Sequence, residues 1–312
     1  MIIITGGCGF IGTNLVKKLN ESNIDIIVLE NLNKNFKYKN IFECNILGLL
    51  PYASSFETII KRYGKPTHVI HLGACSSTTE WDGDILYKQN YSYSISLLED
   101  CIKYSIPIIY ASSASVYGEH CDNRLENEQN LKPLNMYAFY KLLFDRYASK
   151  FFSKGQIIGL RFFNVYGRYE DFKGKMSSPV SGFCDQVINT GEIKLFDTFK
   201  GKSAGDILRD FIYVDDVVED ILHLINSDCY SGIYNIGTGL PTSFLEIAKE
   251  IISVNGSGSI KYIHFPEIIR RGYQFYTKAN CDKITEKFPN RKLCDWRKAI
   301  RIIFEHKRNQ LE

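Results

Sequence analysis

Short apolar runs alternate with longer amphipathic stretches along the first half of the chain. The apolar runs, each of four to six residues, fall at 2–5, 25–30, 67–72, 107–112 and 156–161. Stretches with helical periodicity lie between them, at about 10–20, 85–104 and 137–152. Short strands without a polar face are typical of a parallel sheet that helices cover on both sides. The pattern therefore predicts a doubly wound α/β fold.

The pattern changes after about residue 167. Residues 168–175 are rich in charge, tyrosine and glycine, which predicts a loop. Further on we expect helices near 179–190, 215–226 and 243–254, strands near 211–214, 232–236 and 261–265, and a polar stretch at 200–206. These elements predict a second, smaller α/β domain.

The composition is that of an ordinary globular protein, with 312 residues, 45% hydrophobic and 23% charged, and a net charge of +3. No apolar run approaches the roughly 18 residues of a membrane span, and the first residues lack the basic and long apolar regions of a signal peptide. Nine scattered cysteines form no C-x-x-C pair and no zinc-ligand spacing, so we expect reduced thiols, a cytoplasmic location and no metal site. The small net charge gives no support for a nucleic-acid partner.

The first predicted strand runs directly into a glycine-rich turn over residues 6–12. Gly7, Gly9 and Gly12 match G-x-G-x-x-G, and Gly6, Gly9 and Gly12 match G-x-x-G-x-x-G. Glycines at these positions permit a tight turn and a close approach of the backbone, and the helix that follows presents free N–H groups to a diphosphate. The same pattern also occurs as a plain turn, but its place after the first strand favours a dinucleotide site.

Glu30 ends the second predicted strand, about 20 residues beyond the glycines, where a carboxylate that binds a ribose is expected. An acid at this place favours NAD, because it repels a 2′-phosphate. Lys34, Lys37 and Lys39 follow directly and could neutralise such a phosphate, although a solvated basic loop would have the same composition. These residues alone leave NAD and NADP open.

Tyr137 and Lys141 stand four residues apart and share one face of a predicted helix. Ser113 follows the preceding strand, at the edge where α/β sheets bind ligands. Y-x-x-x-K is common by chance on amphipathic helices, but its combination with Ser113 in one unit is much less so. A tyrosine with a pKa near 10 becomes a base at neutral pH if its pKa falls by about three units, roughly 4 kcal/mol. Because one ammonium at about 4 Å supplies an interaction of that size, the set predicts proton transfer coupled to hydride transfer.

Several segments together resemble the extended short-chain dehydrogenase/reductase superfamily. They are TGGCGFIG (5–12), SSASVYG (112–118), YAFYK (137–141), RFFNVYG (161–167) and RDFIYVDDV (209–217). The resemblance implies a Rossmann-like doubly wound parallel sheet and a nicotinamide cofactor. We therefore expect residues 1–167, rejoined by about 210–236, to form an NADP-binding Rossmann domain, and residues 168–209 and 237–312 to form the substrate-binding domain.

A narrower set of segments resembles the ADP-glyceromannoheptose 6-epimerase family. The set comprises HLGACSSTTEWDG (71–83), PLNMYAFYKLLFD (133–145), FNVYG with KGKM (163–167 and 173–176), SGIYNIGTG (231–239) and GYQFYT (272–277). ACSSTTEW is the most specific of these, because generic sugar-nucleotide epimerases lack it. The resemblance implies epimerisation at C6 of the heptose of ADP-D-glycero-β-D-manno-heptose, by transient oxidation with bound NADP, for lipopolysaccharide inner-core precursors. It also implies a homo-oligomer, such as a pentamer.

The resemblance further implies roles for individual residues. Those implied for catalysis are Ser113, Tyr137, Lys141 and a second acid/base, Lys173. Those implied to bind the cofactor are Gly6, Gly9, Phe10, Ile11, Gly12, Glu30, Asn31, Lys37, Leu72, Gly73, Ala74, Cys75, Ser76, Asn90, Lys141 and Val165, with Lys37 at the 2′-phosphate. Those implied to bind the substrate are Ser77, Thr78, Asn164, Lys175, Phe196, Arg209 and Tyr273. Without the resemblance, Lys173 fits equally well as part of a charged loop, and Arg209 as a partner of Asp210.

Several positions depart from the family pattern. Leu72 replaces an acid, Arg168-Tyr169 replaces Pro-Arg, Lys175 replaces a small residue, Gly182 stands in place of a histidine, and Glu30 is longer than the usual Asp. These departures leave another nucleotide-sugar epimerase or reductase open, such as a UDP-hexose 4-epimerase. A dehydratase usually has an Asp-Glu pair where this chain has Ala114-Ser115. A non-catalytic NADP-sensing protein need not keep the serine, tyrosine and lysine together, as this chain does.

Overall fold

The computed structural model describes residues 1–31, 37–78, 80–127, 129–198, 201, 203, 205–228, 230–266 and 273–310, and all of their side chains except those of His120 and Lys175. The chain forms two compact units. The first comprises Met1–Val116, Asn135–Phe162 and Val218–Tyr234, and the second comprises Tyr117–Leu134, Phe163–Val217 and Asn235–Glu312.

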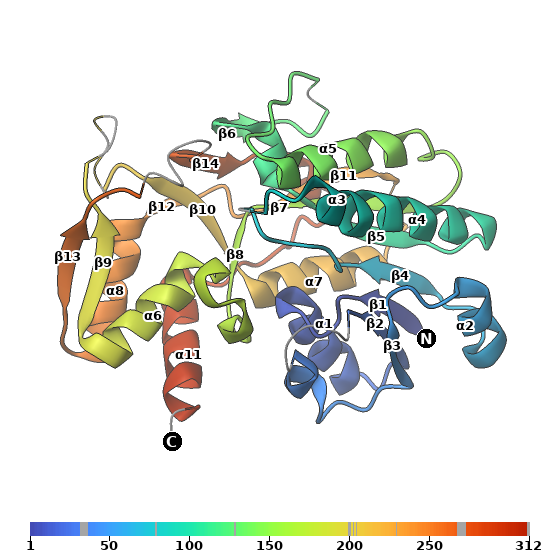
Figure 1. The fold of residues 1–312 in the computed structure, drawn as a ribbon, viewed down its shortest axis with the longest axis horizontal. Coiled ribbons are helices and arrows are strands. Elements are labelled where there is room, and N and C mark those ends of the chain that lie inside the picture. The colour runs from blue at the N-terminus through green and yellow to red at the C-terminus, as the bar shows by residue number, and fades with distance from the viewer. Residues whose placement is uncertain are drawn as a thin grey trace. The chain divides into compact units, whose positions relative to one another are not determined.

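A seven-stranded sheet forms the centre of the first unit, in the order β11-β7-β5-β4-β1-β2-β3 (Figure 1). Its strands are β1 (Ile2–Thr5), β2 (Ile26–Glu30), β3 (Gly48–Pro51), β4 (His68–His71), β5 (Ile108–Ser113), β7 (Ile157–Phe162) and β11 (Gly232–Ile236). The paired strands from β3 through to β7 all run parallel. Parallel strands need crossover connections, which helices supply here.

The helical segments of the first unit lie between these strands. They are α1 (Phe10–Glu21), η1 (Lys37–Ile41), α2 (Phe56–Tyr63), α3 (Gly83–Leu86), the π-helical η2 (Tyr87–Ser92), α4 (Tyr93–Lys103), η3 (Ala114–Tyr117), α5 (Met136–Ser149) and most of α7 (Val214–Ile225). Ile3 and Ile27 lie in one buried cluster with residues of α2, α4 and α5. Val28 points the other way and lies beside Val16 of α1. Both faces of the sheet are therefore covered, which explains why most residues of its strands are apolar.

The second unit is built on a five-stranded sheet in the order β12-β10-β14-β6, with β8 paired to β10, and on the two-stranded sheet β13-β9. Its strands are β6 (His120–Arg124), β8 (Asn164–Tyr166), β9 (Glu192–Phe196), β10 (Leu208–Tyr213), β12 (Pro241–Ser243), β13 (Ser259–Ile263) and β14 (Tyr276–Ala279). Its helices are η4 (Asp171–Met176), α6 (Pro179–Thr190), α8 (Phe244–Asn255), α10 (Asp282–Lys287) and α11 (Trp296–Asn309). β12 is antiparallel to β10, whereas β8 and β14 are parallel to it, so the sheet is mixed.

The structure confirms the predicted fold class, and it corrects the prediction in several places. The loop predicted at 168–175 is partly wrong, because η4 forms within it. Residues 117–134 and 163–167 belong to the second unit, since β6 pairs with β14 and β8 pairs with β10. The chain rejoins the first unit at Val218 rather than at about 210. The other elements that the sequence analysis did not predict are η1, β3, α2, η3, β6, β8, β9, β12, β14, α10 and α11.

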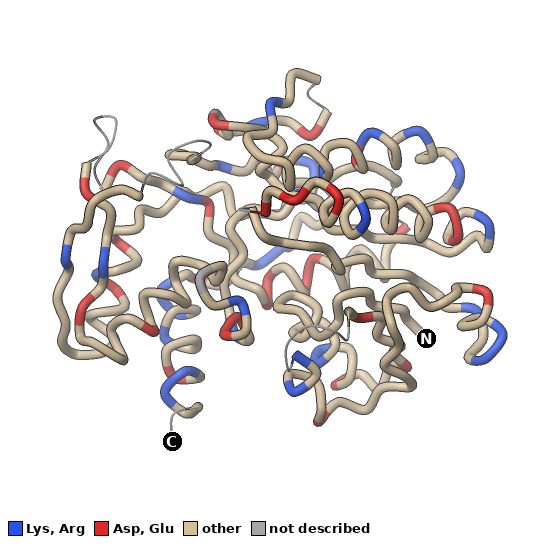
Figure 2. The backbone as a smooth tube through the Cα atoms, in the orientation of Figure 1, with Lys and Arg blue, Asp and Glu red and all other residues tan. Residues whose placement is uncertain are grey.

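The cysteines and charges of the described residues agree with a globular protein. Eight cysteines are free thiols, namely Cys8, Cys44, Cys75, Cys101, Cys121, Cys184, Cys281 and Cys294, and Cys229 lies outside the described residues. Figure 2 shows positive and negative residues interspersed along the chain. In the described part of the chain, no helix is both long enough and apolar enough to cross a membrane.

The carboxylate of Asp210 joins three segments of the second unit. Asp210 is fully buried in β10 and accepts hydrogen bonds from the N–H and hydroxyl of Thr238 at 2.7 Å, from the N–H of Gly239 at 2.8 Å and from the N–H of Ala279 at 2.9 Å. If the carboxylate is removed, these buried N–H groups lose their acceptor.

We therefore expect Asp210→Ala to lower the free energy of unfolding by at least about 3 kcal/mol, because several buried donors would be left unsatisfied. Urea unfolding measures this change. The control is Asp122→Ala, at an exposed position of β6 in the same sheet, for which we expect a change within about 0.5 kcal/mol. Equal effects of the two substitutions would contradict the role given to Asp210.

Candidate functional site

The turn between β1 and α1 has room only for hydrogen atoms at two of its glycines. Gly6 has a φ of +68°, and a Cβ there would lie 2.7 Å from the Cα of Gly73. A Cβ on Gly12 would collide with the carbonyl oxygen of Gly6. Gly9 is the N-cap of α1, so no side chain caps this helix. The turn therefore combines a backbone that a ligand can approach closely with a helix N-terminus, as a diphosphate requires.

The carboxylate of Glu30 turns back toward the glycine turn. Its Oε2 accepts a hydrogen bond from the N–H of Cys8 at 3.1 Å, and its Oε1 accepts one from the N–H of Asn31 at 3.0 Å. Burial and the nearby Glu30 raise the pKa of Cys8 to about 12, while Lys37 acts in the opposite direction. The predicted acid and lysine thus both lie near Cys8, at the carboxyl end of β2. This arrangement suits the adenosine ribose of either NAD or NADP.

A chain of hydrogen bonds connects β1, β4 and the π-helical turn η2. The hydroxyl of Thr5 lies 2.7 Å from Nδ1 of His71, and Nε2 of His71 lies 2.8 Å from the hydroxyl of Ser94, which donates to the carbonyl of Asn90 at 2.9 Å. Burial, as the larger cause, lowers the pKa of His71 to about 3, so the imidazole is neutral. Asn90 also binds the main chain of Cys75 twice, at 2.7 and 2.9 Å. The predicted residue Asn90 therefore fixes the loop after β4.

Ser113, Tyr137 and Lys141 come together at the carboxyl edge of this sheet. Ser113 ends β5, and Asn135 caps α5 by accepting a backbone N–H at 2.8 Å, which places Tyr137 in the first turn. A hydrogen bond joins the hydroxyl of Ser113 to the phenol of Tyr137, and the same hydroxyl lies 2.7 Å from that of Ser115. Lys141 is buried, with Nζ 6.0 Å from the centre of the Tyr137 ring and 2.6 Å from the carbonyl of Ala111, to which it donates. The three predicted residues form one constellation.

Burial shifts the pKa values of this constellation. Burial raises the pKa of Tyr137 to about 12, although the hydrogen bond with Ser113 acts in the opposite direction. Burial also lowers the pKa of Lys141 to about 8, against the attraction of Asp145. In the protein by itself, burial therefore favours the neutral form of Tyr137, and the role of Lys141 and a cofactor cation in making Tyr137 a base stays a prediction.

A buried ion pair supports the constellation from the side of the sheet. Nε of Arg161, in β7, donates to Oδ2 of Asp145, in α5, at 3.0 Å, with side chains 2% and 1% exposed. The hydroxyl of Ser112 donates to the same oxygen at 3.0 Å. Since Ser112 precedes Ser113 and Asp145 lies one turn beyond Lys141, the pair fixes the two segments that carry Ser113 and Lys141.

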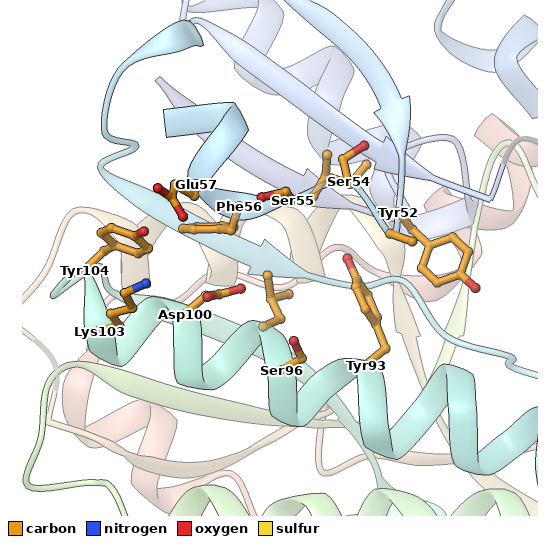
Figure 3. Close-up of a pocket in the computed structure, with 13 residues that line it drawn as sticks. Tyr52, Ser54, Ser55, Phe56, Glu57, Tyr93, Ser96, Asp100, Lys103 and Tyr104 are labelled. Atoms are coloured by element: carbon orange, nitrogen blue, oxygen red, sulfur yellow. The ribbon is translucent and has the colours of Figure 1, made fainter. Parts of the chain in front are cut away.

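A pocket of about 360 Å³ lies between the loop after β3, the start of α2 and one side of α4 (Figure 3). The rings of Tyr52 and Tyr93 meet edge to face, 5.2 Å apart, at one end of it. Leu29, the neighbour of Glu30, lines the pocket, but none of the predicted catalytic residues does. The pocket therefore lies near the end of β2 and is distinct from the Ser113 constellation.

In the second unit, the predicted residues Arg209, Tyr273 and Phe196 form an aromatic cluster with a buried cation. The guanidinium of Arg209 lies 5.1 Å from the centre of the Tyr273 ring. Phe265 lies 4.8 Å from Phe196 and 4.9 Å from Tyr273, measured between ring centres. Arg209 is 6% exposed, and its buried Nη1 has no hydrogen-bond partner among the described residues. This donor of Arg209 suits an anionic group of a ligand, and the neighbouring aromatic side chains suit a planar ring of the same ligand.

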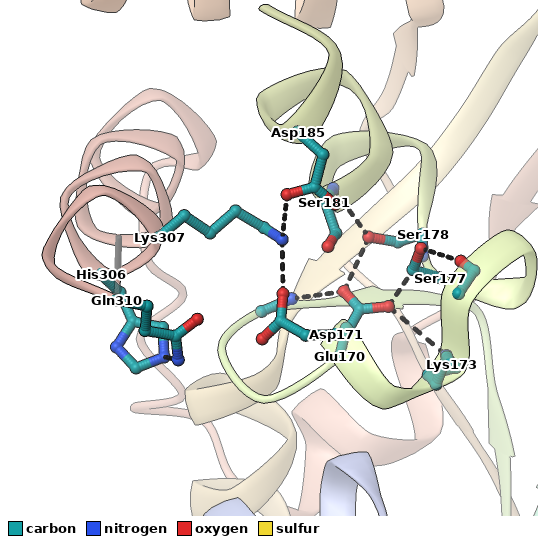
Figure 4. Close-up of polar contacts among 12 residues, drawn as sticks. Glu170, Asp171, Lys173, Ser177, Ser178, Ser181, Asp185, His306, Lys307 and Gln310 are labelled. Carbon is teal, nitrogen blue, oxygen red and sulfur yellow. Dashed lines mark hydrogen bonds and ion pairs between the residues drawn. The ribbon is translucent and has the colours of Figure 1, made fainter. Parts of the chain in front are cut away.

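Lys173 lies in η4, where a buried carboxylate holds it (Figure 4). Its Nζ donates to Oε2 of Glu170 at 3.4 Å. Glu170, whose side chain is fully buried, also accepts from the N–H of Gly167 at 3.0 Å and from the N–H and hydroxyl of Ser178, both at 2.7 Å. Glu170 thus fixes both ends of the segment that carries Lys173.

The remaining predicted residues lie as follows. Ser77 and Thr78 are in the loop after β4, half-buried and exposed respectively. Asn164 and Val165 are in β8, where Asn164 Oδ1 accepts a hydrogen bond from the hydroxyl of Thr277 at 3.3 Å. The side chain of Lys175, and the whole of Lys34, lie outside the described residues. The predicted site residues therefore form two groups, one in each unit.

Sequence reasoning missed the residues that hold this site in place. The polar chain through Thr5, His71 and Ser94 joins residues up to 89 positions apart, which no local pattern reveals. Glu170 carried a readable signal, because it precedes Lys173 by three residues and can pair with it on one helical turn.

Comparison with known proteins agrees with this geometry. The model of the NAD dependent epimerase/dehydratase family matches residues 2–237. A protein of Alkalilimnicola ehrlichii, named ADP-L-glycero-D-manno-heptose-6-epimerase, is 42% identical over 290 residues, covering 91% of this chain and 90% of the relative. A protein of the same name from Brachyspira hyodysenteriae is 41% identical over 292 residues, with coverage of 91% and 90%.

A solved structure supports the same relationship. The ADP-L-glycero-D-manno-heptose-6-epimerase of Helicobacter pylori superposes with a TM-score of 0.85 at 27% identity, covering 98% of this chain and 95% of that one. The resemblance to these epimerases that the motifs predicted is confirmed. With the glycine turn and the Ser113–Tyr137–Lys141 constellation in place, the chain belongs to the NAD dependent epimerase/dehydratase family.

Proposed function

We propose that this chain inverts the configuration at C6 of the heptose in ADP-D-glycero-β-D-manno-heptose, giving the L-glycero epimer for lipopolysaccharide inner-core precursors. The observation that carries the proposal is the Ser113–Tyr137–Lys141 constellation, in a chain 42% identical to an ADP-L-glycero-D-manno-heptose-6-epimerase over 91% of its length. Oxidation and reduction at the same carbon cancel, so the reaction needs no external reductant.

The first unit has the features that a dinucleotide needs. Its glycine turn and the N-terminus of α1 suit the diphosphate, Glu30 and Asn31 suit the adenosine ribose, and the loop held by Asn90 follows β4. We propose NADP, because the cation of Lys37 lies near Cys8 and Glu30, where a 2′-phosphate would need one. When bound, the cofactor would accept a hydride reversibly, and the positive charge of its nicotinamide ring would favour the ionised form of Tyr137.

Tyr137 is the proposed base on one face of C6. Its phenolate takes the hydroxyl proton as hydride leaves the carbon, and Ser113 donates a hydrogen bond to the same substrate oxygen. Lys141, whose pKa is lowered to about 8 by burial, is still mainly charged at neutral pH and stabilises the phenolate. The product of this step is a ketone at C6.

Inversion requires the hydride to return to the opposite face of the ketone, so a second acid is needed there. We assign this role to Lys173, which Glu170 holds by a 3.4 Å ion pair. Arg209 and Tyr273 would bind the ADP group, since Arg209 has a buried donor without a partner among the described residues and Tyr273 offers an aromatic face.

Incubation of the purified protein with ADP-D-glycero-β-D-manno-heptose is expected to give a mixture of both C6 epimers without added reductant. NMR of the sugar nucleotide measures the product stereochemistry. The control substrate is UDP-glucose, which should remain unchanged. Epimerisation of UDP-glucose at C4, with ADP-heptose unchanged, would replace the proposed function by that of a UDP-hexose 4-epimerase.

Tyr137→Phe should lower the epimerisation rate by at least roughly 10²-fold, because the proton acceptor is removed. Cofactor content should stay the same, as measured by absorbance after gel filtration. Tyr140→Phe is the matched control, since Tyr140 lies on the same helix and packs against Tyr87 and Tyr91. A Tyr137→Phe variant with the rate of the Tyr140→Phe variant would show that another group is the base.

Mass spectrometry of the cofactor released from the purified protein is expected to detect NADP. Lys37→Ala should weaken NADP binding by about tenfold, through loss of a charge-assisted hydrogen bond to the phosphate, and leave NAD binding unchanged. Lys39→Ala, at an exposed position of the same turn, is the control. Recovery of NAD alone would exclude the NADP assignment.

A further inference from the structure

The last helix of the chain carries a buried lysine that no part of the proposed mechanism uses. Lys307 lies in the last turn of α11, and its side chain is 6% exposed. Its Nζ donates to Oδ1 of Asp171 at 2.6 Å and to Oδ1 of Asp185 at 2.7 Å (Figure 4). The two aspartate side chains are 44% and 49% exposed. The fold therefore encloses the cation and leaves the two anions near its edge.

The two ion pairs of Lys307, with Asp171 and with Asp185, form a bridge that keeps the lysine charged. Burial acts to lower the pKa of Lys307, but the hydrogen bonds to Asp171 and Asp185 outweigh it, so the pKa is raised and the ammonium stays charged. Without the ammonium, the two carboxylates would face each other with no cation between them. Like charges at short range repel, so the segments that carry them would separate.

Asp171 connects the bridge to the segment that carries Lys173. Asp171 begins η4, directly after Glu170 and two residues before Lys173. Asp185 lies in α6, so Lys307 ties η4 to both α6 and α11. Glu170 holds η4 from the other side through Ser178, the N-cap of α6. Lys173 is thus carried by a short segment that is anchored at Asp171 and at Glu170.

We propose that Lys307 is a positioning residue for the epimerisation, which acts through Asp171 to hold η4 and so fixes Nζ of Lys173. The inference rests on the proposed function of Lys173 as the second acid/base. It assigns to the C-terminal helix a part in the reaction that lies outside every motif of the family resemblance.

The test uses the two epimers separately, because each should depend on a different base. Reduction of the bound cofactor in a single turnover is followed by its near-ultraviolet absorbance, starting from the D-glycero or from the L-glycero substrate. Lys173→Ala should slow reduction from one epimer and leave the other, which Tyr137 serves, unchanged. Lys307→Met should slow reduction from that same epimer by roughly tenfold, with KM changed less than about twofold, because the substitution displaces a reacting group while Arg209 and Tyr273, which are proposed to bind the ADP group, lie outside η4.

Two further variants separate positioning from a general loss of stability. Asp171→Asn removes the carboxylate by which η4 contacts Lys307. It should slow cofactor reduction from the same epimer as Lys307→Met does. Lys298→Met changes an exposed lysine of the same helix and should leave both epimers unchanged. Amide hydrogen exchange over residues 170–176 should be faster in Lys307→Met than in Lys298→Met.

The outcomes distinguish the two proposals. If Lys173→Ala slows neither epimer, the function proposed for Lys173 is wrong. If Lys173→Ala slows one epimer while Lys307→Met and Asp171→Asn slow neither or slow both equally, only the positioning role of Lys307 is overturned. If Lys307→Met does not fold, Asp171→Asn decides the question by the same measurement.

Discussion

The close approach of backbone to backbone around Gly6 is the constraint on which the first unit depends. The N–H of Gly6 donates to the carbonyl of Leu29 at 2.8 Å, and the hydroxyl of Thr5 accepts from the N–H of Gly73 at 3.0 Å. The ends of β1, β2 and β4 therefore converge at one point, and Gly12 brings the start of α1 against it. Because a single methyl group would force these elements apart, the glycines set the geometry of the cofactor-binding edge and everything attached to it.

Buried parallel strands could be predicted because most of their residues are apolar. β1, β2 and β5 lie within a residue or two of the predicted runs for this reason. The strands of the second unit are less evident, since partners far apart in sequence hold them, as Asp210 holds the segments of Thr238 and Ala279. α11 was missed because charged residues occupy much of it and one of them, Lys307, lies on its buried face. A buried lysine breaks the apolar pattern from which such a helix is recognised.

The sequence predicts which residues of the candidate site lie close together, but it does not predict their electrostatics. The spacing of Tyr137 and Lys141 follows from helical periodicity, and the place of Ser113 follows from the sheet. The pKa values of these groups depend on how completely the fold removes water around them, which the order of residues does not contain. Burial drives the tyrosine toward its neutral form and the lysine away from its charged form, so the protein alone disfavours the ion pair that the proposed mechanism uses. That conflict makes the catalytic charge state dependent on what binds beside it.

The carboxylate of Glu30 has one more consequence, for the chemical durability of the site. A cysteine inside a nucleotide-binding turn looks open to oxidation and alkylation, both of which proceed through the thiolate. Cys8 is buried, and its pKa is raised to about 12, so the thiol stays protonated at neutral pH. Burial, and after it the carboxylate of Glu30, therefore keep this sulfur unreactive, and the turn can carry a thiol without becoming the point at which peroxide or electrophiles inactivate the protein.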